Sequence, residues 1–203
     1  MVELFLTILQ KMIKRIFDIC FSGFFILLLS LPLLTISLII FFDTLQNPIF
    51  KQIRNGVNGK RFKMYKFKTM KVSEDGISNF TQAKNNDLRI TSSGRFLRKF
   101  SLDELPQLIN IFIGHMSVVG PRPHPIALDE EFKNKIDNYM ERYSVKPGLT
   151  GLAQINGLRG ETDTLEKMQD RINKDLEYAN SQLSILADIR IIILTLAVFF
   201  KGN

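Results

Sequence analysis

The chain of 203 residues is long enough for one domain with a substantial core, which excludes a large modular enzyme. Its 27 lysine and arginine residues against 20 aspartate and glutamate residues give a formal net charge of +7, which predicts attraction to phosphates, nucleic acid or an anionic membrane. Hydrophobic residues make up 45% of the chain, and the mean hydropathy of +0.05 is high for a soluble domain of this charge. One cysteine, Cys20, excludes an internal disulfide framework, and two histidines without a Cys/His cluster argue against a zinc site.

The first apolar region predicts a membrane segment. No charged side chain occurs in residues 19–42, and about 20 apolar residues suffice to cross the hydrocarbon core as a helix. Pro32 stands in the middle of this run, and a proline inside a helix removes a hydrogen bond and bends the chain. We therefore expect a break at Ser30 and Pro32 that divides the run into two shorter helices.

Basic residues flank this run on both sides. Lys11, Lys14 and Arg15 precede it, and Lys51 and Arg54 follow it. Because positive residues mark the cytoplasmic side of a membrane segment, this pattern favours a re-entrant hairpin that enters one leaflet and returns. A conventional transmembrane helix is the alternative. A cleaved signal peptide is disfavoured, because no cleavage site of small residues follows the run.

Turn and strand signals predict a β-hairpin within residues 48–70. Two Asn-Gly dipeptides separate two β-prone runs, and the second run interleaves aromatic and basic residues. Lys66 and Lys68 are two residues apart and should project from the same face of a strand. There they could meet lipid headgroups, a phosphorylated substrate or single-stranded nucleic acid, or they could simply be solvated.

The most informative stretch, residues 94–110, predicts a helix that carries two carboxylates. Apolar residues recur there at the spacing of one helix face, and polar residues fall opposite. The carboxylates would therefore face away from the buried stripe. The expected apolar positions are Leu105, Leu108, Ile109 and Phe112, and the expected polar positions are Asp103, Gln107 and Asn110, with Glu104 at their edge.

Two interpretations of this carboxylate pair are open. In the first, Ser101 caps the helix and Glu104 returns the hydrogen bond in a capping box. Pro106 argues against it, because a helix that starts at Asp103 instead would place the proline in the tolerated first turn. In the second, Asp103 stands at a helix N-terminus, where the macrodipole stabilises the ionised form of a nucleophile. Arg98 just upstream would then help to bind phosphate.

The second half of the chain adds a rigid arginine and further helices. Arg122 lies between two prolines, and a rigidly held guanidinium suits bidentate phosphate recognition, although an ordinary loop arginine is the alternative. We expect His115 and His124 to be structural. Residues 191–200 are apolar but too short to span a membrane, so they predict a helix on the membrane surface or in the core. Leu165, Met168, Ile172 and Leu176 outline an amphipathic packing helix.

Four motifs occur in order along the chain. They are Arg-Ile-Thr-Ser-Ser-Gly-Arg-Phe-Leu-Arg at 89–98, Ser-Leu-Asp-Glu-Leu-Pro-Gln-Leu at 101–108, Met-Ser-Val-Val-Gly-Pro-Arg-Pro at 116–123 and Pro-Gly-Leu-Thr-Gly-Leu-Ala-Gln at 147–154. With them the chain resembles the bacterial sugar transferase family, the monotopic polyprenyl-phosphate phosphoglycosyl transferases. The likeness extends over nearly the whole chain, and such an ordered series is highly specific.

The resemblance implies transfer of a sugar 1-phosphate from a UDP-sugar to undecaprenyl phosphate, with release of UMP. It implies a covalent route in which the aspartate that matches Asp103 attacks the sugar-linked phosphate. Glu104 matches the residue that helps to hold Mg²⁺, and Arg98 and Arg122 match phosphate-binding arginines. In similar proteins the membrane helix breaks at a Ser-Pro pair, whereas here one leucine separates the two residues. We expect Lys68 and Arg159 to complete the phosphate-binding set.

The segment at 156–168 is similar to the subgroup that transfers glucose or galactose phosphate and starts capsule, exopolysaccharide or O-antigen repeats. Relatives that handle N-acetylated or diamino sugars tend to place an arginine directly after Asn-Gly, whereas here Leu158 precedes Arg159. UDP-glucose or UDP-galactose is therefore the expected donor, and an N-acetylated or diamino UDP-sugar is the alternative.

The expected fold class is α+β and mainly helical, with amphipathic helices on the membrane surface and the protein on the cytoplasmic face of the bacterial inner membrane. We expect no nucleic-acid partner, and a homodimer is possible in principle. A noncatalytic scaffold that binds the membrane surface or nucleic acid is the competing hypothesis. The expected parts of this one functional unit are an N-terminal helix with a re-entrant hairpin at 1–48, a cytoplasmic catalytic domain at 49–180 and a membrane-interface helix at 181–203.

Overall fold

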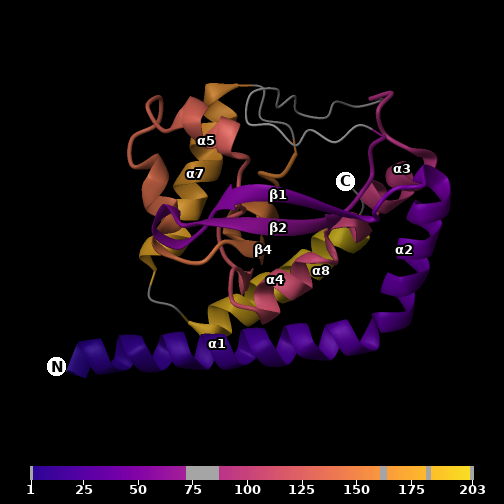
Figure 1. The fold of residues 1–203 in the computed structure, drawn as a ribbon. Coiled ribbons are helices and arrows are strands. Elements are labelled where there is room, and N and C mark those ends of the chain that lie inside the picture. Colours follow the sequence, from indigo (N-terminus) through magenta and orange to yellow (C-terminus); the bar gives the residue numbers. More distant parts are fainter. Residues whose placement is uncertain (1, 72–86, 161–163, 182–183, 202–203) are drawn as a thin grey trace.

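Two long helices form a bracket along one side of the molecule (Figure 1). The structure is a computed structural model that describes residues 2–71, 87–160, 164–181 and 184–201. Helix α1 (Val2–Leu28) runs beneath the other elements, and α2 (Ser30–Thr44) rises at one end. The remaining elements are β1 (Ile49–Asn55), η1 (Val57–Gly59), β2 (Arg61–Phe67), α3 (Ser92–Lys99), η3 (Leu102–Glu104), α4 (Gln107–Phe112), β3 (Ser117–Val119), α5 (Ile126–Phe132), η4 (Tyr139–Ser144), β4 (Gly148–Thr150), α6 (Leu152–Ile155), α7 (Leu165–Asn180) and α8 (Ile185–Lys201), where η denotes a 3₁₀ turn.

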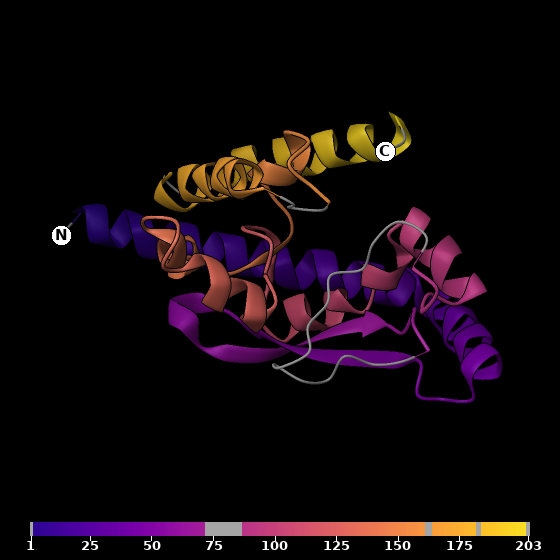
Figure 2. The same ribbon diagram turned by 90° about the horizontal axis from the view of Figure 1, so that it is seen from above.

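The mainly helical α+β class expected from the sequence is confirmed. Seen from above, the β1–β2 hairpin lies on one side of α1, and α7 and α8 lie on the other (Figure 2). The hairpin is antiparallel and joined through η1, as the Asn-Gly pairs predicted, with Asn58 and Gly59 at positive φ. Strands β3 and β4 form a second, parallel pair.

The chain bends by 63° between α1 and α2. The helix breaks at Leu29, whose ψ of 9° is not helical, and α2 begins at Ser30. Pro32 is therefore the third residue of α2, where a missing N–H leaves no helical hydrogen bond unmade. Among the described residues no single helix is long and apolar enough to cross a membrane, whereas the bent pair together reaches the necessary length and composition.

Helix α1 is joined to the rest of the chain by polar side chains on its inner face. Asp18 Oδ1 accepts hydrogen bonds from Ser117 Oγ and from the Val118 N–H of β3, each at 2.9 Å. Arg15 donates to two carbonyl oxygens at the end of α4, at 2.8 and 2.7 Å. Lys14 forms an ion pair with Asp188 of α8. These bonds fix α1 against three separate elements.

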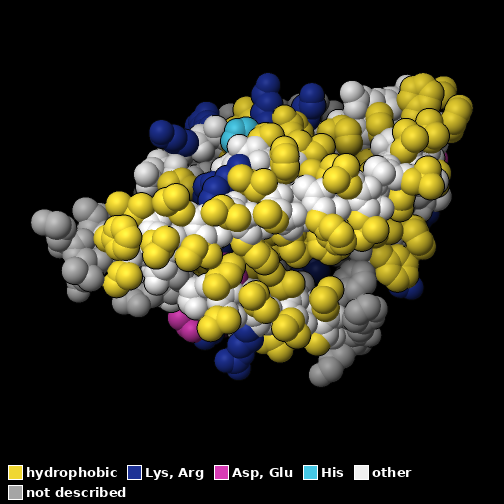
Figure 3. All heavy atoms as spheres, turned by 90° about the horizontal axis from the view of Figure 1, so that it is seen from below, with side chains coloured by type: hydrophobic (Ala, Val, Ile, Leu, Met, Phe, Trp, Pro, Cys, Tyr) yellow, Lys and Arg dark blue, Asp and Glu magenta, His cyan; other side chains and the backbone are white. Residues whose placement is uncertain are grey.

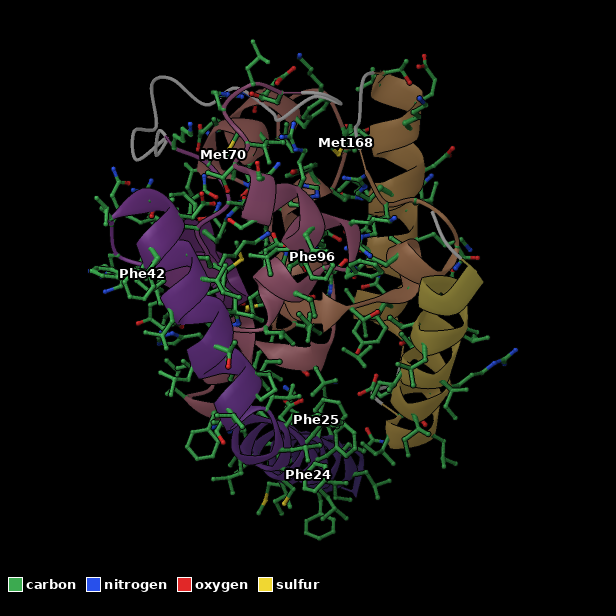
Figure 4. All side chains as sticks on the ribbon, turned by 90° about the vertical axis from the view of Figure 1, so that its right-hand side faces the viewer. Phe24, Phe25, Phe42, Met70, Phe96 and Met168 are labelled. Carbon is green, nitrogen blue, oxygen red and sulfur yellow. The ribbon has the colours of Figure 1, made fainter. Side chains whose placement is uncertain are left out.

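The opposite side of α1 is apolar (Figure 3). Figure 4 shows Phe24 on the outer side of α1, where it is 59% exposed, whereas Phe25 packs against the core. Phe42 of α2 is also exposed. Such a broad exposed apolar surface indicates an interaction with a membrane or another apolar partner. Further exposed members are Ile16, Leu27 and Leu28 of α1, Leu31 and Leu34 of α2, Ile109, Phe112 and Ile113 in and after α4, and Leu186, Ile193 and Leu196 of α8.

The burial predicted for the helix within residues 94–110 is confirmed at Leu108, which lies in the core, and at Leu105, which packs against it, but is wrong at two other positions. Ile109 and Phe112, expected in the core, are 43% and 45% exposed, whereas Gln107 and Asn110 are buried. The physical reason is that the Asn110 amide continues the hydrogen bonding of β2. Its Nδ2 donates to the Lys63 carbonyl at 2.7 Å, and its Oδ1 accepts from the Tyr65 N–H at 2.8 Å. The polar face therefore turns inward.

Helices α7 and α8 cover the core from one side. Met168 and Ile172 of α7 are fully buried, which confirms the predicted amphipathic helix. The C-terminal helix begins at Ile185, earlier than its apolar run suggested, and has two faces. Ile191 packs into the core, which confirms in part the expected core helix, whereas the far side of α8 is exposed, and its expected place on the membrane surface stays a prediction.

Three glycines, in β4 and in the loops after β3 and β4, let the backbones of these neighbouring segments come into direct contact. A Cβ on Gly148 would lie 2.1 Å from the backbone nitrogen of Gly120, and one on Gly120 would lie 2.3 Å from the Lys146 carbonyl oxygen. A Cβ on Gly151 would lie 2.3 Å from the Gly120 carbonyl oxygen. Only glycine fits these three positions, because a side chain would push the strand and the following loop apart.

We expect Gly148→Ala to destabilise the protein by at least about 2 kcal/mol, since its Cβ meets backbone atoms that cannot rotate away. Thermal unfolding followed by circular dichroism in detergent checks this. Gly23→Ala is the matched control, because its Cβ would meet Phe112 at an ordinary 3.4 Å inside α1. Equal melting temperatures for the two variants would contradict the backbone contact.

Candidate active site

The two carboxylates lie in η3, a single 3₁₀ turn between α3 and α4. The helix expected to begin at Ser101 or Asp103 is divided in two: Ser101 adopts a left-handed conformation with φ of 51° before η3, and α4 starts only after Pro106. Ser101 makes no side-chain capping bond to η3, so the capping-box interpretation is wrong. Leu105 and Pro106 follow η3 in the right-handed helical region and lead into α4, so Asp103 lies in the first turn of this helical segment, the position that the second interpretation gave it.

Glu104 is held by two basic side chains and is only 7% exposed. Arg122 makes a bidentate contact, with Nη1 donating to Oε2 at 3.0 Å and Nη2 donating to Oε1. Lys66 Nζ donates to Oε1 at 3.1 Å. Burial disfavours the charge, but Arg122 and Lys66 outweigh it and hold the pKa of Glu104 well below its ordinary value. Glu104 is therefore ionised at neutral pH.

Asp103 lies beside this pair and has a different environment. It is partly buried, and burial raises the pKa of its carboxyl, an effect to which the neighbouring Glu104 charge adds. Lys66 is the strongest opposing influence, followed by Arg98 and Arg122. The adjacent carboxylates are thus shifted in opposite directions, a pattern typical of residues with different chemical roles.

The structure brings three of the four expected phosphate-binding residues to this turn. Arg98 Nε donates to Thr69 Oγ1 at 2.8 Å and acts electrostatically on the neighbouring Asp103. Arg122 contacts Glu104, as described above. Arg159 Nη2 donates to Ser101 Oγ at 2.7 Å, at the start of η3.

The fourth expected residue, Lys68, lies elsewhere. Its Nζ donates to Gln46 Oε1 at 2.7 Å, beyond the end of α2. Lys66 instead contacts Glu104, and the sequence prediction did not include it among the site residues. The available signal was the two-residue spacing of Lys66 at the end of β2 and Lys68 just after it, which gave no means of choosing between the two positions.

Glu104 is suited to supply one protein ligand to a Mg²⁺ ion. Among the described residues, no three His, Cys, Asp or Glu side chains cluster as a metal site. In the described part of the chain, hydrogen bonds from Lys66 and Arg122 occupy both acceptor positions of Oε1 but only one of Oε2, so Oε2 keeps a position for a cation. Protein-bound Mg²⁺ commonly takes one or two carboxylates and completes its shell with substrate phosphates and water.

A buried polar cluster supports the loop that carries Arg122. His124 Nδ1 accepts a hydrogen bond from Arg142 Nη1 at 2.6 Å and lies 2.7 Å from the Tyr139 hydroxyl. Asp129 Oδ1 accepts from the hydroxyls of Tyr139 and Tyr143, at 2.8 and 2.9 Å. His124 is thus a structural residue, as expected.

Adjacent carboxylates enclosed by basic side chains, on a scaffold with a broad apolar face, are typical of proteins that act on phosphorylated substrates at a membrane. The chain belongs to the bacterial sugar transferase family, whose family model matches residues 9–202. The family resemblance of the sequence motifs is thereby confirmed.

Three relatives illustrate the similarity. The UDP-glucose:undecaprenyl-phosphate glucose-1-phosphate transferase of Escherichia coli K12 is 49% identical over 193 residues, which cover 95% of this chain and 40% of that protein. The Caulobacter vibrioides protein of the same name is 42% identical over 182 residues, covering 90% and 67%. The exopolysaccharide production protein PSS of Rhizobium leguminosarum bv. phaseoli is 43% identical over 187 residues, covering 91% and 93%. The chain thus spans less than half the length of the Escherichia coli protein.

The His124 cluster predicts a pH dependence of stability. Burial, reinforced by Arg142, holds the pKa of His124 well below its ordinary 6.5. Below that pH the unfolded chain takes up a proton that the folded imidazole does not, so this residue's contribution to stability falls as pH falls, by up to about 1.4 kcal/mol per pH unit. We expect His124→Gln to show a flatter melting temperature between about pH 6.5 and pH 5 than the unmodified protein.

The control is His115→Gln, because the His115 side chain is exposed. That variant should keep the original slope of melting temperature against pH. An unchanged slope in His124→Gln would show that the buried imidazole is not responsible.

Proposed function

We propose that the chain transfers a hexose 1-phosphate from UDP-glucose or UDP-galactose to undecaprenyl phosphate and releases UMP. The observation that carries this proposal is the Asp103–Glu104 pair enclosed by Lys66, Arg98 and Arg122. Both substrates are phosphorylated, so a site for them needs several positive charges around a reactive group. The names of the relatives support the same reaction, and exopolysaccharide, capsule or O-antigen synthesis is the proposed setting.

Asp103 is the proposed nucleophile. Its carboxylate oxygen attacks the sugar-linked phosphorus of the UDP-sugar, the bond from that phosphorus to the bridging oxygen breaks, and UMP leaves. A phosphate oxygen of undecaprenyl phosphate then attacks the same phosphorus and displaces the Asp103 carboxylate. The reaction needs Asp103 ionised, and Lys66 and Arg98 favour that state against burial. Covalent catalysis avoids a direct encounter between two anionic substrates.

Glu104 and its arginine have supporting roles in this proposal. Arg122 keeps Glu104 charged and holds its carboxylate in place beside Asp103. Glu104 would hold Mg²⁺, which when bound supplies charge neutralisation to the diphosphate. Arg98, which contacts Thr69, and Arg159, which contacts Ser101, would bind phosphate oxygens.

The apolar bracket gives the proposed relation to the membrane. Exposed apolar side chains lie along both α1 and α2, which the 63° bend separates, and among the described residues neither helix alone is both long and apolar enough to span a membrane. We propose that the pair enters one leaflet and returns, which would place η3 on the cytoplasmic face beside its lipid substrate. The basic residues at both ends of the apolar run support this orientation.

The first experiment tests the nucleophile. Purified Asp103→Asn, given UDP-glucose or UDP-galactose, Mg²⁺ and undecaprenyl phosphate, should lose at least about a thousandfold in UMP release, because an amide cannot form the intermediate. Intact-mass spectrometry should detect the phosphohexose adduct on the unmodified protein without acceptor. Asp137→Asn, which changes an exposed carboxylate, is the control and should keep full activity. Unaltered turnover in Asp103→Asn would sink the proposal.

A second experiment tests the topology. Lys11→Cys and Lys51→Cys are introduced separately into a Cys20→Ser background, since Cys20 is exposed and would react. In intact cells a membrane-impermeant maleimide should label neither position, and both should react once the cells are opened. Labelling of only one of the two in intact cells would establish a spanning segment instead.

A further inference from the structure

Arg142 of η4 holds the loop that carries Arg122. It is fully buried at 0% exposure, and its Nη2 donates to the main-chain carbonyl of Arg122 at 2.5 Å. The side chain of Arg122 in turn binds Glu104. Because the guanidinium of Arg142 is sealed from solvent, it acts on this loop and cannot itself meet a substrate.

Arg171 of α7 holds the second loop in the same way. Its Nε donates to the Leu158 carbonyl and its Nη2 to the Gly160 carbonyl, both at 3.0 Å. These carbonyls lie on either side of Arg159, whose own side chain reaches Ser101. A forked guanidinium can make both bonds at once, whereas an ammonium group has no matching planar geometry.

Asp175 joins the two buried arginines. It is 1% exposed, its Oδ2 lies 2.6 Å from Arg142 Nη2, and Arg171 precedes it by one turn on the same face of α7. The carboxylate therefore helps to compensate the buried positive charges of Arg142 and Arg171, together with Asp129 in the case of Arg142. One helix thus connects to both loops.

We propose that Arg142, Arg171 and Asp175 form a brace that positions Arg122 and Arg159 for phosphate binding. The two loops reach η3 at its opposite ends, at Glu104 and at Ser101, so the brace sets the width of the site around the nucleophile. The three members are positioning residues, since none touches the proposed ligand position. The proposal rests on the proposed function only for the chemistry of the ligand, a diphosphate.

The test uses the full chain in detergent with Mg²⁺ and two measurements. Isothermal titration calorimetry with pyrophosphate reports phosphate binding without turnover, and UMP release from UDP-glucose gives KM and kcat separately. The variants are Arg171→Lys and Arg142→Lys, each of which keeps the positive charge beside Asp175 but loses the planar fork of the guanidinium. Lys174→Met is the control on α7, because Lys174 pairs only with the exposed Glu177 in the described contacts.

We expect the brace variants to weaken pyrophosphate binding at least about tenfold and to raise KM for UDP-glucose more than they lower kcat, with the control unchanged. A variant that melts as the unmodified protein does yet binds pyrophosphate more weakly supports positioning. Unchanged pyrophosphate affinity in folded Arg171→Lys, or no pyrophosphate binding by the unmodified protein, overturns the brace. Pyrophosphate binding without UMP release from any UDP-sugar would contradict the proposed function. The pyrophosphate affinities of the variants and the unmodified protein would still decide whether the brace positions the two arginines.

Discussion

Glu104 carries a charge that is almost removed from water, and the rest of the site depends on compensating it. A buried carboxylate without a partner is unstable by several kcal/mol, so it either takes up a proton or recruits cations. Here Lys66 comes from β2 and Arg122 from the loop after β3, two elements that are distant in the sequence. The ion pair therefore requires the hairpin and the glycine contact between β3 and β4 to be formed together.

The compensation of charge by basic side chains also distinguishes Glu104 from Asp103, although both side chains are carboxylates. Arg122 grips Glu104 through both nitrogens, whereas Asp103 makes no comparable bidentate contact in the described residues. One carboxylate is consequently fixed and permanently charged, and the other remains available for reaction. The difference arises from the one-turn helix, which points consecutive side chains in different directions about the chain axis.

The sequence predicted features that local chemistry determines. Two Asn-Gly pairs were sufficient to locate the hairpin, and Pro32 located the bend to within a few residues. Periodicity failed in α4, because the Asn110 amide is satisfied by strand backbone and the exposed Ile109 belongs to the apolar surface. Apolar spacing cannot tell a face that packs in the core from one that meets an apolar solvent.

The site was predictable as a set of motifs and not as a geometry. Asp103, Glu104, Arg98 and Arg122 could be proposed because they stand in recognisable short segments. Lys66 and the brace could not, since their importance arises from contacts across long separations in the chain. The sequence does not distinguish a buried arginine from an exposed one, and the main-chain carbonyls to which Arg142 and Arg171 donate are brought near only by the fold.

The inner face of α1 has a consequence for how this protein is handled. Asp18, Arg15 and Lys14 attach the helix to β3, α4 and α8, while the outer face of the same helix is apolar. Helix α1 is therefore a structural part of the domain as well as the carrier of its apolar face. A fragment without α1 would therefore lose hydrogen bonds and ion pairs with three other elements at once.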